Sequence, residues 1–132
     1  MPMIEVNVNE AHELEVVEPN QEYKLRIVDV RVGTDKNDDD YFMPRFEVVD
    51  RPYAKDFSYY VKKPKKETMN PRDFNDALLI VKHLCEAFGF DTSRPFDPED
   101  SLPGLEGWAI LGKKDSDEYG EQNVIKKFIV RR

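Results

Sequence analysis

The stretch DFSYYVKKPKK, residues 56–66, brings four lysines and three aromatic side chains together. Lysine ammonium groups bind phosphate oxygens, and an exposed aromatic ring stacks on a nucleobase with a gain of about 1 to 3 kcal/mol per base. Surfaces that bind single-stranded nucleic acid without reading its sequence combine these two kinds of side chain. The stretch is typical of such a surface, although outward lysines also serve only to keep a strand edge soluble and unpaired.

Two further segments, residues 23–32 and 41–49, also have cations on the polar face of a predicted strand. Lys62 has the corresponding position in residues 57–62. In each segment polar side chains alternate with apolar ones, so that one face of a strand is polar and the other buried. Each of the three predicted strands has a cation on its polar face, and one of the strands also has an outward aromatic ring. This coincidence favours a binding surface over a solvated edge. The candidate nucleic-acid contacts are the phosphate-binding residues Lys24, Arg26, Arg45, Lys62, Lys63, Lys65 and Lys66 and the stacking residues Tyr41, Tyr53 and Tyr60.

The formal net charge of −7 is unevenly distributed along the chain. Residues 1–22 contain six of the 27 acidic residues and none of the 20 basic ones, which leaves 20 basic and 21 acidic residues in the remainder. The remainder is nearly neutral, and net charge alone is a poor guide to its local field. Its last segment, NVIKKFIVRR, has no acid and no purely apolar face, so Lys126 and Lys127 contribute to the basic surface or simply face water.

The residues that could support catalysis or bind a metal do not form a recognisable site. The sequence has no glycine-rich nucleotide loop, no HExxH and no GxSxG. A single cysteine, Cys85, excludes an internal disulfide and a cysteine-based zinc site, and it falls on the apolar side of a predicted helix. His83 is expected beside that side as a partly buried structural residue, and His12 lies in the acidic N-terminal segment without an obvious partner. We expect no enzymatic activity and no metal or organic cofactor.

The acidic segment GTDKNDDD resembles the start of a calcium-binding EF-hand loop. Asp35, Asn37 and Asp39 match its first ligand positions. Asp40 stands where the sharp turn requires glycine, and Phe46 stands where the loop requires a bidentate glutamate. We therefore expect a solvated acidic turn whose charge repels nucleic acid from that side.

The elements that position these residues are mostly strands. Residues 1–20 are expected to form a short edge strand or a loose arm, and a strand follows from Tyr23. The apolar parity of this strand shifts after Ile27, which requires a bulge or a sharp bend. In the next strand, residues 41–49, Pro44 removes a ladder donor, so the strand is bulged or has an unpaired edge there. Further strands are expected at 57–62, 107–113 and 123–131.

One helix is expected between the third and fourth strands. Asn70 is a good N-cap, Pro71 suits the first helical position, and Gly89 supplies the C-terminal stop. The apolar side of the helix is formed by Phe74, Ala77, Leu78, Val81, Leu84, Cys85 and Phe88. Further aromatic residues expected mostly in the core are Phe42, Phe46, Phe57, Tyr59, Trp108 and Phe128.

A chain of 132 residues fits one domain. The predicted elements follow the order of a small Greek-key barrel: three strands, then a helix, then two strands. We expect a mainly β fold, a five-stranded OB-fold Greek-key barrel with one α-helix between strands three and four. The acidic N-terminal arm or edge strand then covers residues 1–20, and the domain that binds single-stranded DNA covers residues 21–132. No apolar run approaches the roughly 20 residues that span a bilayer, so we expect a soluble, cytoplasmic protein.

Several short segments resemble those of a known family. They are PNQEYKLRIVDVRV, PRFEVVD, CEAFGF, GLEGWAILGKK and NVIKKFIVRR, spread over residues 19–132. Together they resemble a family of small phage-encoded proteins that are regarded as single-stranded DNA-binding proteins with an OB-fold. The resemblance implies a replication or recombination accessory, in the host-cell cytoplasm, that coats single strands without sequence preference. Many such proteins end in an acidic tail that recruits partner enzymes, whereas the acidic segment here is N-terminal.

Two functions of different classes remain open. The first is sequence-nonspecific binding of single-stranded DNA, or RNA, through the outward face of the first three strands, with replication or recombination proteins as further partners. The second is an OB-like adaptor or virion assembly protein whose barrel face docks another protein. A docking face is apolar at its centre, whereas the predicted face is cationic, which favours the first function. Residues 1–22 would compete with DNA for the basic face or dock partners.

Overall fold

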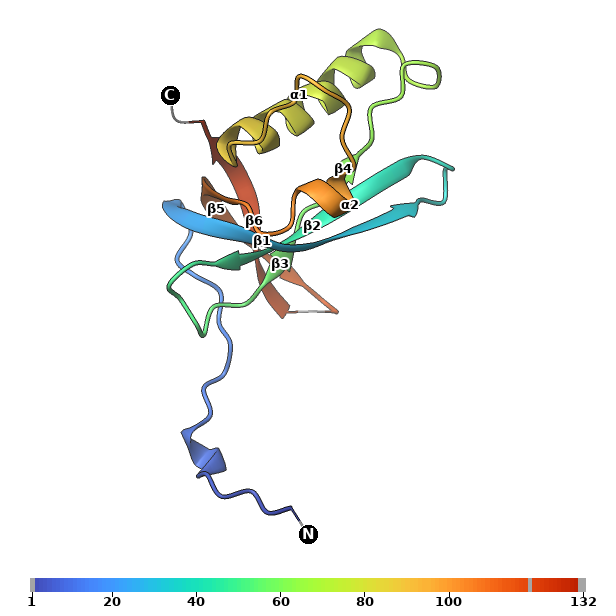
Figure 1. The fold of residues 1–132 in the computed structure, drawn as a ribbon. Coiled ribbons are helices and arrows are strands. Elements are labelled where there is room, and N and C mark those ends of the chain that lie inside the picture. Colours follow the sequence, from blue (N-terminus) through green and yellow to red (C-terminus); the bar gives the residue numbers. More distant parts are fainter. Residues whose placement is uncertain (1, 119, 131–132) are drawn as a thin grey trace.

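The computed structural model describes residues 2–118 and 120–130, and it is mainly β (Figure 1). One antiparallel sheet of six strands contains β1 (Gln21–Thr34), β2 (Asp40–Val48), β3 (Phe57–Ser58), β4 (Val61–Lys62), β5 (Glu106–Ser116) and β6 (Gly120–Ile129). The helices are a 3-10 helix, η1 (Val8–Glu10), and the α-helices α1 (Pro71–Ala87) and α2 (Pro98–Ser101). The mainly β class is confirmed, and α1 lies between the strands that the sequence predicts. The short helix α2 follows it in the same connection, where only one helix was expected.

The order of strands in the sheet is β3-β2-β1-β5-β6, and β4 pairs with β2 beyond the end of β3. All of these ladders are antiparallel. The two ends of the sheet approach each other, because β3 contacts β6, but among the described residues no ladder joins them. The sheet is therefore curled without closing into a barrel, and it has six strands where five were expected.

The additional strand arises because Pro44 interrupts the predicted third strand. β3 and β4 pair with β2 in one continuous register on either side of the interruption. Between them the Tyr59 N–H donates to the Pro44 carbonyl oxygen at 3.1 Å, but Pro44 has no N–H to donate in return. This gap is the unpaired edge predicted at Pro44, and it divides residues 57–62 into two short strands.

The long strand β1 belongs to both halves of the sheet. Its first residues, 21–26, pair with β5, and its pairing with β2 begins at Leu25 and runs to the end of the strand. The register shifts between Ile27 and Asp29, which is the bulge predicted from the apolar parity. Leu25 and Ile27 are buried before the bulge and Val30 is buried after it. The bulge thus keeps apolar side chains on the inner face.

Helix α1 begins and ends where the sequence predicts. The Asn70 side chain accepts a hydrogen bond from a backbone N–H of the first turn at 2.9 Å, and Pro71 is the first helical residue. Gly89 has a φ of +68°, the left-handed conformation that ends many helices. At Gly107 of β5 an added Cβ would lie 2.5 Å from the Ala87 carbonyl oxygen, so glycine lets the end of α1 approach the sheet closely.

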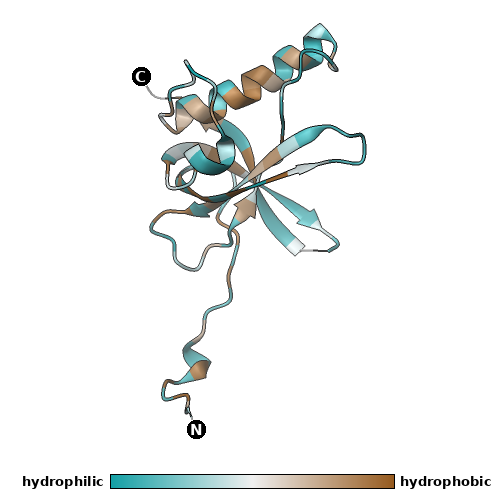
Figure 2. Ribbon diagram, turned by 45° about the vertical axis from the view of Figure 1, so that its right-hand side comes forward, coloured by the Kyte–Doolittle hydropathy of each residue, from teal (hydrophilic) through white to brown (hydrophobic). Residues whose placement is uncertain are grey.

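The predicted apolar side of α1 is only partly buried. Ala77, Leu84 and Cys85 are buried, and so is Phe88 just after the helix, whereas Leu78 is 43% exposed. Figure 1 shows the first half of the helix rising away from the sheet, and Figure 2 shows hydrophobic residues along its middle. None of the helices in the described part of the chain is both long and apolar enough to cross a membrane.

The inner face of the sheet and the buried side of α1 form the core. The predicted core aromatics that are buried are Phe42, Phe46, Phe57 and Phe128. The Phe46 ring lies 5.5 Å from that of Phe57 and 5.6 Å from that of Phe88, so it joins the sheet to the helix. Tyr59 is partly buried and packs against this core. The core assignment of Trp108 is wrong, because this residue is 37% exposed and lies opposite Lys24 on the outer face.

The N-terminal segment is an arm that is tied to the body at its base. The Glu15 N–H donates to the Tyr53 carbonyl oxygen, and the Val17 N–H donates to the Asn123 side chain, each at 2.9 Å. Asn123 is buried, and its amide group donates back to the Val17 carbonyl oxygen at 3.1 Å. Residues 2–11 extend away from the body on the side opposite α1 (Figure 1). The only strand pairing of the described part of the arm is an isolated bridge at Glu15.

Candidate nucleic-acid interface

The outer face of β1, β2 and β5 carries a network of ion pairs around Arg26. Its guanidinium group donates to Glu106 of β5 at 2.7 and 3.0 Å and also to Glu47 of β2. Lys24 forms a second ion pair with Glu106 at 3.2 Å. Hydrogen bonds from Arg26 and Lys24 lower the pKa of Glu106, and hydrogen bonds to Glu106 and Glu47 raise the pKa of Arg26. Both predicted phosphate-binding residues of β1 are therefore already paired with carboxylates.

Arg45, the predicted cation of β2, is paired in the same way. Its guanidinium group contacts Asp29 Oδ2 at 2.7 Å and Asp56 Oδ2 at 2.8 Å. The hydrogen bond between Arg45 and Asp29 raises the pKa of the arginine and lowers that of the aspartate. We name these three cations and four carboxylates the paired cluster: Lys24, Arg26, Arg45, Asp29, Glu47, Asp56 and Glu106. The prediction of a cationic middle of this face is therefore wrong.

The acidic turn between β1 and β2 forms ion pairs with lysines that follow β3. Asp39 forms an ion pair with Lys62 at 3.0 Å, and Asp40 forms one with Lys65 at 3.1 Å. The hydrogen bond from Lys65 lowers the pKa of Asp40, and the hydrogen bond to Asp39 raises the pKa of Lys62. Residues 36–38 of the turn are exposed, as expected of a solvated turn. Asp39 and Asp40 instead lie against the basic residues and offset part of their charge.

Two of the predicted stacking residues lie together at this end of the sheet. The ring centroids of Tyr41 and Tyr60 are 5.0 Å apart, with 33° between the ring planes. Tyr60 is 45% exposed, and its hydroxyl donates to Asp35 Oδ2 at 3.0 Å. Gly33 of β1 makes room for Tyr41, because a Cβ there would lie 2.6 Å from the tyrosine hydroxyl oxygen. We name Tyr41 and Tyr60 the tyrosine pair.

The third predicted stacking residue, Tyr53, lies elsewhere. It follows β2, whereas Tyr41 is near the start of that strand, so the length of β2 separates the two rings. The Tyr53 ring stacks on His12 of the arm at a centroid distance of 4.0 Å. Tyr53 is therefore not part of the tyrosine pair, and His12 has a partner that the sequence did not reveal.

A groove of about 600 Å³ lies beside Tyr60, between β2 and β3 on one side and the hairpin of β5 and β6 on the other. The wall residues suited to contact a nucleic acid are Met43, Arg45, Tyr59, Tyr60, Lys114 and Gln122. Lys114 is exposed and has no carboxylate partner among the described residues, whereas Lys113 pairs with Glu121 at 3.6 Å. Sequence reasoning missed Lys114 because the alternation of β5 ends at Lys113 and residues 114–122 were predicted as a loop.

Two predicted cations have no carboxylate partner among the described residues. Lys63 lines the cavity beneath α1 and not the groove beside Tyr60. Lys66 is exposed in the turn that follows β4. Of the predicted phosphate-binding set, only Lys66 is thus both exposed and free of a carboxylate in the described part of the chain.

The basic residues of β6 take different orientations. Lys127 lies on the outer face opposite Ile110 of β5. Lys126 occupies the position where the register of β5 and β6 shifts, and its ammonium group donates to the Asn20 side chain. The predicted strand residue Arg131 lies outside the described residues.

The potential catalytic residues His12, His83 and Cys85 do not line this groove. Burial raises the pKa of the Cys85 thiol to about 11, so the reactive thiolate is scarce near neutral pH. His83 is exposed, not partly buried as predicted. In residues 2–118 and 120–130, no group of three or more His, Cys, Asp or Glu side chains could hold a metal ion.

No model of a protein family matches this sequence, and no curated protein is similar to it at a significant level. The resemblance to the phage-encoded family therefore stays a prediction. The groove, the tyrosine pair and the pairing state of each cation are the basis on which a function can be argued.

Proposed function

We propose that this protein binds single-stranded nucleic acid without sequence preference, as a member of the phage-encoded replication and recombination family that its segments resemble. The observation that carries the proposal is the tyrosine pair at the edge of a groove lined by Arg45 and Lys114. Sequence-tolerant binding needs rings for base stacking and cations for phosphates along one path. The groove and the tyrosine pair supply both on neighbouring elements.

An OB-type fold is part of the proposal, and the arrangement of the strands supports it. The order β3-β2-β1-β5-β6, with a bulged β1 in both halves and α1 before β5, is expected of an OB barrel left open between β3 and β6. OB-folds bind oligonucleotides on their second and third strands and on two flanking loops. The corresponding parts here are β2, β3 and β4, the acidic turn and the β5–β6 hairpin.

The ion pairs decide which cations contact phosphate most readily. Lys114 and Lys66 lose no carboxylate partner among the described residues when they bind a phosphate. Arg45 must share its guanidinium group between the phosphate and its two carboxylates. We therefore assign base stacking to Tyr60 and Tyr41, the main phosphate contacts to Lys114 and Lys66, and a weaker contribution to the paired cluster.

Fluorescence anisotropy of labelled oligo-dT tests the proposal. One oligonucleotide has about 4 to 16 nucleotides, the length that one OB-fold covers, a second is longer, and a duplex serves as the control. We expect binding to the single strand that weakens linearly in log salt, with a slope of about −0.7 per phosphate contact. Equal affinity for the duplex, or no binding at low salt, would overturn the proposal.

A protein-docking adaptor for replication or virion assembly is the second candidate. It is favoured by three exposed apolar residues of α1, Leu78, Leu79 and Ile80, with exposures of 43%, 40% and 37%. Contiguous exposed apolar residues mark protein contacts. The paired cluster, with three cations and four carboxylates, is not cationic, so it also removes the argument that a cationic face excludes this function. The anisotropy measurement separates the candidates, because an adaptor leaves the oligo-dT signal unchanged even at low salt.

A further inference from the structure

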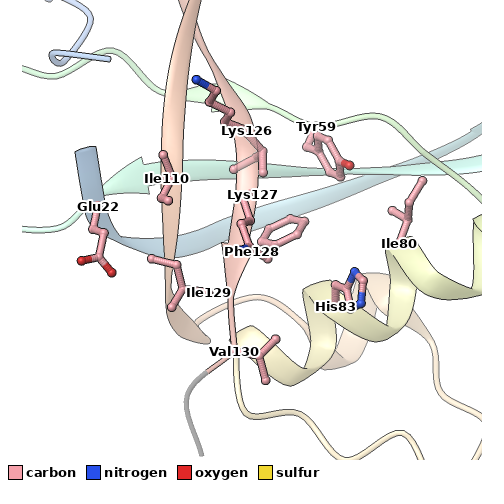
Figure 3. A pocket seen from close by; sticks show the side chains of 11 residues that line it. Glu22, Tyr59, Ile80, His83, Ile110, Lys126, Lys127, Phe128, Ile129 and Val130 are labelled. Atoms are coloured by element: carbon pink, nitrogen blue, oxygen red, sulfur yellow. The ribbon is translucent and has the colours of Figure 1, made fainter. Parts of the chain in front are cut away.

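Strand β6 forms an open edge of the sheet. Within the described residues it pairs only with β5, and a groove of about 650 Å³ lies between it and α1. Figure 3 shows this groove, with Ile80 and His83 on α1 at one side and residues 126–130 along β6 at the other. Open strand edges are templates for pairing with another chain, and native proteins usually cover or blunt them.

The wall of this groove is apolar with a basic margin. Its aliphatic side chains are Ile80, Ile110, Ile125, Ile129 and Val130. Its charged residues are Lys126, Lys127 and Glu22, so cations outnumber acids. An extended segment with alternating apolar and acidic residues would match such a wall.

The N-terminal arm alternates apolar with polar residues, of which Glu5 is acidic and Asn7 and Asn9 are neutral amides. Its apolar side chains are exposed by between 63% and 78%: Met3, Ile4, Val6 and Val8. In an extended chain Ile4, Val6 and Val8 share one side with Glu10, and Glu5 lies on the other. Of the six acids of residues 1–22, Glu5 and Glu10 lie in residues 2–11, and residues 1–22 have no Lys or Arg. The short helix η1 buries no residue, so little is lost when it opens into a strand.

We propose that the arm of one copy of this chain adds as a strand to the edge of β6 in a second copy. Ile4, Val6 and Val8 then fill the groove between β6 and α1. Main-chain hydrogen bonds along the open edge provide affinity, and the alternate side chains fix the register. The ammonium groups of Lys126 and Lys127 attract Glu5 on the other side of the arm. When each copy gives its arm to the other, the product is a symmetric dimer.

The base of the arm directs it towards another copy and not towards its own groove. Hydrogen bonds at Glu15 and Val17 and the stacking of His12 on Tyr53 hold the base against the body. Figures 1 and 2 both show the arm leaving on the side opposite α1. The remaining residues, 2–11, span roughly 30 Å when extended, enough to follow β6 of a neighbour.

Sedimentation of the full chain in the micromolar range, without nucleic acid, measures the association. We expect a concentration-dependent dimer that weakens about tenfold or more in Val6→Glu and in Ile80→Glu, because each places a charge in the apolar contact. The matched controls are Asn9→Glu, on the other side of the arm, and Leu79→Glu, which is equally exposed on α1 but outside the groove. A monomer at all concentrations, or a dimer that Leu79→Glu weakens as much as Ile80→Glu does, would overturn the proposal.

Cysteine cross-linking identifies which segments meet. Chains with Val6→Cys are mixed with chains that carry Ile80→Cys and are oxidised with copper phenanthroline, and the buried Cys85 stays unreactive. We expect a disulfide between the two kinds of chain, and the same result from Ile4→Cys or Val8→Cys at a neighbouring register. Links between two Val6→Cys chains alone would contradict the proposal. A link within single chains of the double variant, formed under dilute conditions, would show that the arm folds back on its own body and would contradict it equally.

Discussion

The middle of the outer sheet face and the rim of the groove beside Tyr60 contain the same kinds of residue in different electrostatic states. In the middle, Lys24, Arg26 and Arg45 face four carboxylates. At the rim, Lys114 has no carboxylate partner among the described residues, and Tyr60 of the tyrosine pair is exposed in the same groove. This difference shows that the charge of a surface depends on whether its cations face carboxylates on neighbouring strands. The number of lysines and arginines alone does not determine it.

The partners in the middle follow from the register of the strands. Arg26 lies directly opposite Glu47 on β2 and opposite Glu106 on β5. Asp29 lies opposite Arg45 because the bulge in β1 shifts the register just before it. Opposite charges on facing residues stabilise a strand pair. The paired cluster is therefore best explained as part of what holds the curled sheet together, and the rim as the part available to a ligand.

The largest expected effect is on the tyrosine pair. Tyr60→Ala should weaken binding of oligo-dT by about 5- to 150-fold, because one stacked base contributes about 1 to 3 kcal/mol. Tyr60→Phe keeps the ring and loses only the hydrogen bond to Asp35, so it should bind nearly as well as the original chain. Tyr53→Ala is the positional control, since that ring stacks on His12 at the other end of β2. Anisotropy at constant salt measures all three, and equal losses for Tyr53→Ala and Tyr60→Ala would refute the assignment.

Removing one cation from each region sharpens the comparison directly. Lys114→Ala should weaken binding several-fold and reduce the salt slope by about 0.7, the value for one phosphate contact on a single strand. Lys24→Ala removes the same charge but leaves Glu106 bonded to Arg26, so its salt slope should stay unchanged. The measurement is a salt titration of oligo-dT binding for both variants. A larger change of slope for Lys24→Ala would reverse the roles assigned to the two regions.

Removing a carboxylate from the paired cluster should leave a cation in the middle of the face without its carboxylate partner, which is the state of Lys114 at the rim. Glu106→Gln releases Lys24 and weakens the hold on Arg26. We expect a few-fold tighter binding of oligo-dT at low salt and a steeper salt dependence. Glu99→Gln on α2 changes the net charge equally at a residue outside the paired cluster and should have little effect. Identical gains in both variants would mean that only net charge matters and that the pairing of the cluster does not limit binding.

The inner half of the molecule could be predicted from the sequence because its signals are local. Alternation in β2 identified Phe42 and Phe46 as core residues, and the cap at Asn70 and the stop at Gly89 gave the bounds of α1. The parity shift in β1 gave the bulge. Each of these features depends on residues within a few positions of one another.

The outer face could not be predicted, because its state depends on residues that are distant in sequence. Glu106 is separated from Arg26 by most of the chain and meets it only through the pairing of β1 with β5. Lys114 enters the groove only because β5 continues past the alternating segment. Trp108 was placed in the core because of its apolar ring, although its position opposite Lys24 turns it outward. The residue types were correctly noted, but the pairing that decides their role was not encoded locally.

The smallest effect expected is a dependence on pH that reports the paired cluster itself. The pKa values of Asp29 and Glu106 are lowered by their hydrogen bonds to arginine and lysine. A carboxylate with a lowered pKa contributes stability that is complete above its unfolded pKa and is lost as the pH falls through its folded pKa. Thermal unfolding should therefore show a declining midpoint below about pH 4.

The same protonation should release cations of the paired cluster. The fraction that remains folded should then bind oligo-dT more tightly than at neutral pH, since thymine takes up no proton in this range. Glu106→Gln lacks one of the titrating groups, so both its loss of stability and its gain in binding on acidification should be smaller. Parallel pH profiles for Glu106→Gln and the original chain would show that Glu106 does not restrain the cations of the paired cluster. The middle of the face and its rim would then differ in function only through the tyrosine pair, and not through the pairing of their cations.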